Sequence, residues 1–149
     1  MDRPIEIYVD GAFKGGLIAY GYVIHNSDCS KAIDVQVKRP TTHFQNVEAE
    51  ITAVLEALRH IYRNYWTTNT GKIILYYDLN LIKDIIYNRK LQLKNPYYEN
   101  YATEFRTLEE HLKCEVIFKK VTNNPIHNYI DEEIRKKLNS SLKNKLQSL

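Results

Sequence analysis

The sequence lacks the features that mark secreted, membrane-spanning or disulfide-rich proteins. Its two cysteines, Cys29 and Cys114, are far apart and have no metal-ligand spacing, so we expect reduced thiols in a cytoplasmic protein. No apolar run approaches the roughly 18–20 residues that span a bilayer. The opening stretch MDRPIEIYVD has neither the basic nor the apolar region of a secretory signal. We therefore expect a cytoplasmic protein without a membrane partner.

Strong charge of one sign and internal repetition are also absent. The net charge of +3 permits nucleic-acid binding but does not argue for it. Basic side chains gather in residues 89–94 and 135–145, and charge alone favours ordinary solvated faces there. The 149 residues contain no repeat, low-complexity tract or linker. We expect one domain, residues 1–149, that is monomeric.

The N-terminal third reads as three strands. Ile5, Ile7 and Val9 alternate with polar residues or tyrosine, which predicts a strand over residues 4–10 that ends at an aspartate. Residues 18–26 and 32–38 read as a second and a third strand, and the short turns between them predict an antiparallel meander.

The rest of the chain alternates between helical and strand patterns. The predicted elements are a helix over 44–62, a strand over 72–77, a helix over 80–87, a basic connection over 88–96, a helix over 97–112, a strand over 114–121 and a final helix through 130–142. Strands separated by helices run parallel through crossovers. The predicted fold is therefore α/β, with a mixed five-stranded sheet in the order 3-2-1-4-5, an antiparallel second strand, and helices on both faces.

Two of the predicted strands end at an aspartate, Asp10 in IYVD and Asp78 in LYYD. Taken singly, each reads best as a turn residue or a helix cap. In a parallel pair, however, both strand ends lie at one edge of the sheet, where open α/β sheets bind ligands. The matching positions favour a shared site.

Two helices each place one more acid near that edge. Glu50 has Ala53, Val54 and Ala57 beside it at helical spacing, so it borders the buried seam, although a first-turn glutamate also suits the helix dipole. Glu48 and Glu56 lean toward the polar side of the same helix. Asp131 follows an apolar position of the last helix and lies between core and solvent.

Four carboxylates at one place would repel one another unless cations neutralised them. Oxygen ligands without cysteine or clustered histidine favour Mg²⁺ or Mn²⁺. Two such ions, about 3.5–4 Å apart, can activate a water and stabilise the leaving oxygen of a phosphodiester. We expect Asp10, Glu50, Asp78 and Asp131 to bind two such ions.

These motifs resemble those of the ribonuclease H family, type 1 branch. The stretches YVDGAF, QNVEAEITAV and YYDLNLI are similar, in order, to the family's first strand, its first helix and its fourth strand. The resemblance covers about residues 5 to 140. It implies an RNase H-like fold, two metal ions at the four acids, and cleavage of the RNA strand of RNA–DNA hybrids.

The resemblance also implies substrate contacts. Asn46 matches an asparagine that contacts the nucleic-acid backbone, and Gly11 and Ala12 would let the minor groove approach the first strand. Arg89 and Lys90 belong to a basic stretch that we interpret as a platform for the DNA strand. The fourth motif, VTNNPIHNYID, departs from the family because its loop has no histidine, and His127 stands where the family has asparagine.

Three functions fit this pattern. The first is a metal-dependent endonuclease that hydrolyses the RNA strand of RNA–DNA hybrids. The second, which the altered fourth motif motivates, is a catalytically weak RNase H-like module that binds nucleic acid. The third is a related nuclease of the same fold, such as a junction resolvase. Asn46 and the DGA turn favour the first.

Overall fold

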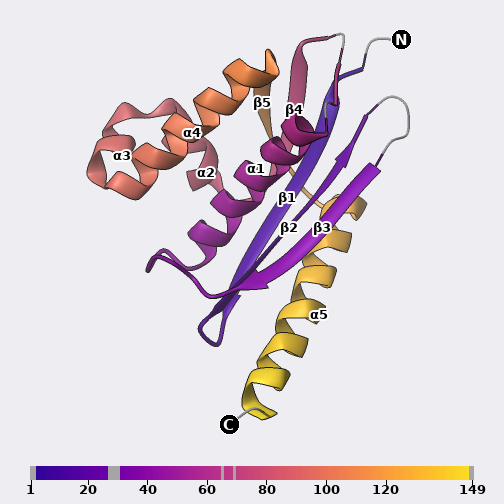
Figure 1. The fold of residues 1–149 in the computed structure, drawn as a ribbon, viewed down its shortest axis with the longest axis vertical. Coiled ribbons are helices and arrows are strands. Elements are labelled where there is room, and N and C mark those ends of the chain that lie inside the picture. The colour runs from indigo at the N-terminus through magenta and orange to yellow at the C-terminus, as the bar shows by residue number, and fades with distance from the viewer. Residues whose placement is uncertain (1–2, 27–30, 65, 69, 148–149) are drawn as a thin grey trace.

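A computed structural model describes residues 3–26, 31–64, 66–68 and 70–147 (Figure 1). Cys29 lies outside these residues, and Cys114 is a free thiol. The strands are β1 (Ile5–Lys14), β2 (Leu17–His25), β3 (Lys31–Lys38), β4 (Lys72–Tyr77) and β5 (Glu115–Lys120). The helices are α1 (Asn46–Arg63), α2 (Asn80–Tyr87), α3 (Arg89–Lys94), α4 (Pro96–Leu112) and α5 (Pro125–Gln147).

The strands form one mixed sheet in the order β3-β2-β1-β4-β5. β2 pairs antiparallel with both β1 and β3, whereas β4 pairs parallel with both β1 and β5. The predicted strand order and directions are confirmed. Short turns suffice for the antiparallel pairs, and the parallel pairs are joined through helices.

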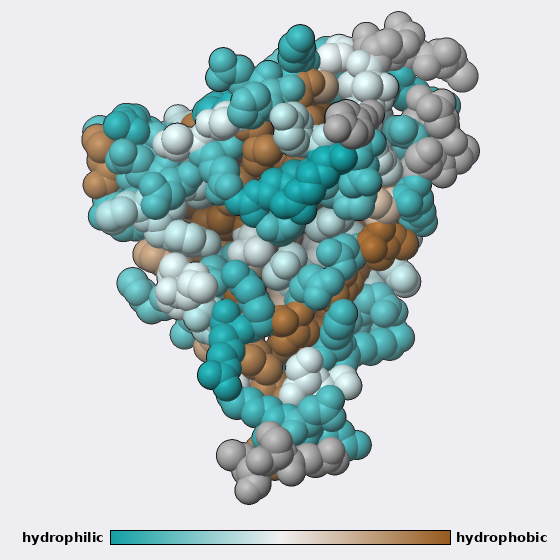
Figure 2. Space-filling view, in the orientation of Figure 1, coloured by the Kyte–Doolittle hydropathy of each residue, from teal (hydrophilic) through white to brown (hydrophobic). Residues whose placement is uncertain are grey.

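Helices cover both faces of the sheet, as the sequence predicted (Figure 1). On one face α1, α2 and α4 pack over a large apolar cluster that includes Ile7, Leu58 and Phe105. On the other face α5 packs over a smaller cluster that includes Ile130 and Ile134. Hydrophilic residues dominate the face shown in Figure 2, with hydrophobic patches between them. None of the helices in the described ranges has the length and apolar character that a membrane crossing requires.

Two predicted elements are wrong in detail. Residues 88–96 are not an irregular connection, because α3 (Arg89–Lys94) forms there. The side chain of Asn88 caps it by accepting hydrogen bonds from the backbone N–H groups of Lys90 (3.0 Å) and Leu91 (3.3 Å). The first strand does not end at Asp10 either. It continues to Lys14 because β2 pairs with it along its whole length.

Candidate active site

Asp10 lies where β1 stops pairing with β4. The parallel pairing extends to Tyr8 opposite Tyr76. Asp10 and Asp78 each follow two residues later, so the register brings both aspartates to the same end of the parallel strands. The predicted matching positions of the two acids are therefore present, although β1 itself runs on.

Helix α5 approaches β2 directly beside Asp10. Asp10 pairs across the sheet with Gly21, and a Cβ on Gly21 would lie only 3.2 Å from Cγ2 of Ile130. The absence of a side chain at Gly21 thus lets α5 pack closely. Because Asp131 follows Ile130, this contact fixes the place at which the fourth acid meets the sheet.

Helix α1 approaches β1 by the same means on the opposite face. A Cβ on Gly11 would lie 2.6 Å from Cβ of Ala49 and 2.7 Å from the backbone nitrogen of Glu50. This contact brings Glu50, whose exposed fraction is 4%, to the carboxylate of Asp10. The N–H of Gly11 donates a hydrogen bond to Oδ1 of Asp10 at 2.9 Å.

The buried carboxyl groups of Asp10 and Glu50 share a site that favours protonation. Burial raises the pKa of Asp10 to about 6, against the lowering effects of a hydrogen bond with Glu50 and the charge of His127. Burial also raises the pKa of Glu50 well above its usual value, and the charges of Asp10 and Asp78 raise it further. Without a cation, burial therefore favours the protonated form of both carboxyl groups.

The four predicted acids interact at one place. Asp10, Asp78 and Asp131 line a cleft of about 440 Å³ together with His127 and Arg135. Glu50 forms part of the same electrostatic network beneath it, because its pKa responds to both Asp10 and Asp78. The charge of Asp131 in turn raises the pKa of Asp10. Residues from β1, α1, α5 and the end of β4 therefore converge.

Two basic side chains lie beside these carboxylates. Arg135 pairs with Asp131 at 2.7 Å, and Nε2 of His127 lies 3.8 Å from Oδ1 of Asp10. In the described part of the chain, no group of three or more His, Cys, Asp or Glu residues is arranged so that it could hold a metal ion. The donor chemistry nevertheless fits a hard divalent cation, since Oε2 of Glu50 is buried without a hydrogen-bond partner among the described residues.

Asp78 itself is exposed, and its backbone is held from β5. The ammonium group of Lys120 donates hydrogen bonds to the carbonyl oxygen of Asp78 and, at 2.8 Å, to Oδ1 of Asn80. The same ammonium lies 5.8 Å from the ring centroid of Tyr77. Lys120 therefore ties the end of β4 and the start of α2 to the neighbouring strand.

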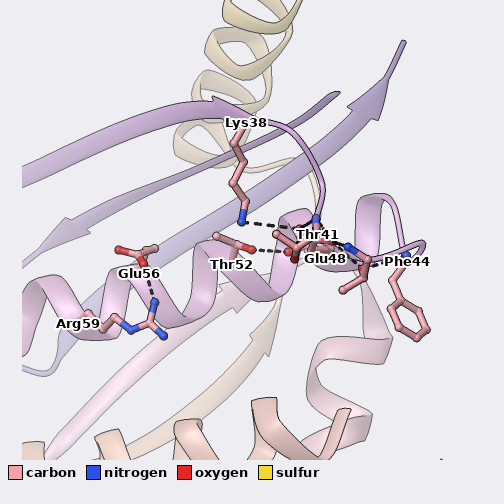
Figure 3. Close-up of polar contacts among 8 residues, drawn as sticks. Lys38, Thr41, Phe44, Glu48, Thr52, Glu56 and Arg59 are labelled. Carbon is pink, nitrogen blue, oxygen red and sulfur yellow. Dashed lines mark hydrogen bonds and ion pairs between the residues drawn. The ribbon is translucent and has the colours of Figure 1, made fainter. Parts of the chain in front are cut away.

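The prediction that Glu48 faces the polar side of α1 is wrong. Its exposed fraction is 1%, and its carboxylate accepts hydrogen bonds from both backbone N–H groups and both hydroxyls of Thr41 and Thr42, at 2.6–3.2 Å (Figure 3). The ammonium nitrogen of Lys38 lies 3.7 Å from Oε2 of Glu48. Burial alone would raise the pKa of Glu48, but these partners outweigh it and lower the pKa. Glu56 is partly exposed and pairs with Arg59, as a polar-side residue does.

The residues predicted to contact substrate lie outside the cleft lining. Asn46 begins α1, and Arg89 and Lys90 begin α3. All three are exposed. Ala12 is partly buried in β1. The missing side chain of Gly11 makes room for α1 within the protein itself, and its contact with nucleic acid, like those of the other four residues, stays a prediction.

Sequence reasoning did not assign His127 and Arg135 to the site. Both lie one helical turn from Asp131, on either side of it, so all three share one face of α5. That four-residue spacing was the available signal. It had little weight while the approach of α5 to β1 was unknown.

The fold is similar to those of solved ribonuclease H1 structures. The N-terminal RNase H domain of Rv2228c from Mycobacterium tuberculosis, solved as a fusion with maltose-binding protein, has a TM-score of 0.74 and 18% identity over 95% of this chain and 98% of that one. RNase H1 from the halophilic archaeon Halobacterium salinarum NRC-1 has a TM-score of 0.71 and 18% identity over 93% and 99%. LC11-RNase H1, isolated from compost by a metagenomic approach and solved in complex with an RNA/DNA hybrid, has a TM-score of 0.68 and 18% identity over 90% and 99%.

No protein-family model matches the sequence, and no curated protein does. The structural likeness nevertheless spans almost the whole of each compared chain, with the same mixed sheet and flanking helices. The chain therefore has the ribonuclease H fold, as its motifs predicted.

Proposed function

We propose that this protein is a metal-dependent endonuclease that hydrolyses the RNA strand of RNA–DNA hybrids. The observation that carries the proposal is the meeting of Asp10, Glu50, Asp78 and Asp131 at one cleft in a ribonuclease H fold. One protein of similar fold was solved in complex with an RNA/DNA hybrid.

The four acids would hold two Mg²⁺ or Mn²⁺ ions. Asp10 interacts with both Glu50 and Asp131, so it would help to hold the ions together with these two acids. Glu50 supplies the buried oxygen that lacks a partner among the described residues. The chemistry that two bound ions supply is activation of a water and stabilisation of the leaving oxygen.

The protein groups would fix the geometry of that reaction. Hydrolysis joins the oxygen of water to phosphorus and breaks the bond from phosphorus to O3′, which leaves a 3′-hydroxyl. The hydrogen bonds from Gly11 and Lys120 hold the carboxylate of Asp10 and the backbone of Asp78 in place, which limits the reorganisation needed at each step. Recognition of RNA 2′-hydroxyls would restrict cleavage to the RNA strand.

Cleavage assays with defined substrates test this proposal. End-labelled RNA would be presented as an RNA–DNA hybrid and as an RNA duplex, beside a four-way DNA junction, with Mg²⁺, Mn²⁺ or a chelator. We expect the RNA of the hybrid to be cut only with metal, and Asp10→Asn to abolish cleavage while retaining its circular dichroism spectrum. Intact RNA at high concentrations of folded protein would overturn the proposal, and preferred cutting of the junction would favour a resolvase.

Two observations favour a second candidate, a module that binds hybrids with little or no turnover. Arg135 forms an ion pair with the carboxylate of Asp131 at 2.7 Å. The described residues also contain no group of three or more His, Cys, Asp or Glu arranged to hold a metal ion. Tight hybrid binding without cleavage in both Mg²⁺ and Mn²⁺ would identify this function. Monomeric state and cytoplasmic location stay predictions, the first of which size-exclusion chromatography tests.

A further inference from the structure

His127 is held in a fixed position at the start of α5. The side chain of Asn124 accepts hydrogen bonds from the backbone N–H groups of Ile126 (2.9 Å) and His127 (3.1 Å), which caps the first turn. The imidazole is largely buried, with 12% of its side chain exposed, and it lines the cleft beside Asp10 and Asp131. The protein thus directs a histidine into its carboxylate cluster from a rigid helical turn.

The imidazole has an unused nitrogen. Nε2 of His127 is buried and has no hydrogen-bond partner among the described residues. Its nearest charged neighbour, Oδ1 of Asp10, is 3.8 Å away, which exceeds the roughly 2.7–3.2 Å of an N–H···O hydrogen bond. Burying a polar atom without a partner is costly, so such an atom calls for an explanation.

A shared metal ion would provide that partner. Nitrogen and oxygen ligands each lie about 2.1 Å from an ion of this size, so two ligands of one ion are at most about 4.2 Å apart. The 3.8 Å between His127 Nε2 and Asp10 Oδ1 falls within this limit. Asp131, four residues along the same helix, lines the same cleft.

We propose that Nε2 of His127 coordinates the divalent ion held by Asp10, so that the site has a mixed nitrogen and oxygen ligand set that favours Mn²⁺ over Mg²⁺. Mg²⁺ is a hard cation that takes oxygen ligands, whereas transition-metal ions accept imidazole. Mn²⁺ combines that tolerance with a preference for carboxylates. This inference rests on the metal dependence of the proposed function.

Electron spin-echo spectroscopy of bound Mn²⁺ tests the inference without substrate. A coordinated imidazole adds a ¹⁴N modulation to the Mn²⁺ signal. The full chain would be compared with His127→Asn, with His127→Gln as a second substitution in case the first fails to fold. His111→Asn is the matched control, since His111 is exposed in the last turn of α4. We expect the modulation in the unmodified protein and the control, and its loss in both His127 variants.

Calorimetric titration supplies a second readout. We expect His127→Asn to weaken Mn²⁺ binding by about tenfold or more, in line with the loss of a group that supports a metal site, and to change Mg²⁺ binding much less. Bound Mn²⁺ without ¹⁴N modulation, equal losses for the two metals, or no Mn²⁺ binding would each overturn the inference. Hybrid cleavage measured on the same samples decides the proposed function independently, because activity without a nitrogen ligand leaves that function intact.

Discussion

Gly11 and Ala49 are in direct contact: a Cβ on Gly11 would lie 2.6 Å from the Cβ of Ala49. This approach of β1 and α1 sets the distance between Asp10, which precedes Gly11, and Glu50, which follows Ala49. The pairing of the two most buried acids of the site therefore depends on a residue without a side chain. The same contact supports both the core and the proposed chemistry.

Replacing Gly11 with alanine is expected to destabilise the protein. The added methyl group would meet backbone atoms of Ala49 and Glu50 at 2.7 Å, and these cannot rotate away, so we expect a loss at the upper end of about 1–3 kcal/mol for overpacking. Denaturant unfolding measures it. The control is Gly71→Ala, where φ is +67° but nothing lies within 4 Å, and the expected loss is about 1 kcal/mol. Equal losses would contradict the steric argument.

Asp10→Asn is expected to stabilise the metal-free protein at neutral pH. The raised pKa of Asp10, about 6, means that the folded state binds a proton more tightly than the unfolded state. The proton on Asp10 therefore stabilises the folded state fully below about pH 4, and this stabilisation is lost as the pH rises through about 6. The variant should therefore be more stable by roughly 1–3 kcal/mol at pH 7 and lack this pH dependence. Unfolding in chelator measures it, and an unchanged pH profile would contradict it.

Glu48→Gln is expected to destabilise the protein at neutral pH by about 1.5–3 kcal/mol, because it removes charge-assisted hydrogen bonds. Since the folded pKa of Glu48 is lowered, its contribution is full above the usual glutamate pKa of about 4.3 and is lost as the pH falls through the folded pKa. The difference from the unmodified protein should thus shrink in acid.

Glu56→Gln on the same helix is the control for Glu48. Glu56 is partly exposed and pairs with Arg59, so we expect a loss below about 1 kcal/mol. Thermal or denaturant unfolding from pH 7 to pH 3 compares the two variants. A larger effect at Glu56 would show that the buried cluster is not the stabilising one.

Lys120→Met is expected to reduce cleavage more than stability. Methionine keeps an unbranched stem near Tyr77 but removes the hydrogen bonds to the Asp78 carbonyl and to Asn80. Small displacements of catalytic groups are costly, so we expect cleavage to fall by about tenfold or more, and the free energy of unfolding to fall by about 1 kcal/mol. Lys119→Met, on the same strand and exposed, is the control. Equal activity of the two variants would contradict this positioning role.

Local periodicity was enough to predict most of the fold. The alternation in β2 and β3 and the helical spacing in α1 and α4 reflect which side chains are buried, and the connection lengths then limited the strand directions. The prediction failed at α3, because an Asn88 cap closes a short turn that has no apolar stripe. It failed at the end of β1 because pairing with β2, rather than the Asp-Gly pair, decides where that strand stops.

The candidate site was predicted only in part, for a similar reason. Asp10, Glu50, Asp78 and Asp131 each carried a local signal, such as a strand end or a position beside an apolar seam. Glu48 carried none that pointed to its partners, and His127 carried only its four-residue spacing from Asp131. Glu48 is enclosed by the segment before α1, and His127 lies beside Asp10 on β1, which is far from it in the sequence.

By itself, the sequence determined the elements, their order and the chemical character of the site, because burial patterns and acidic side chains are local properties. Only the tertiary structure decided how close the acids come, how burial shifts their pKa values and which basic groups face them. Those properties depend on the contact of α1 with Gly11 and of α5 with Gly21. Electrostatic interactions vary with distance and burial, and both are set by packing between residues far apart in the chain.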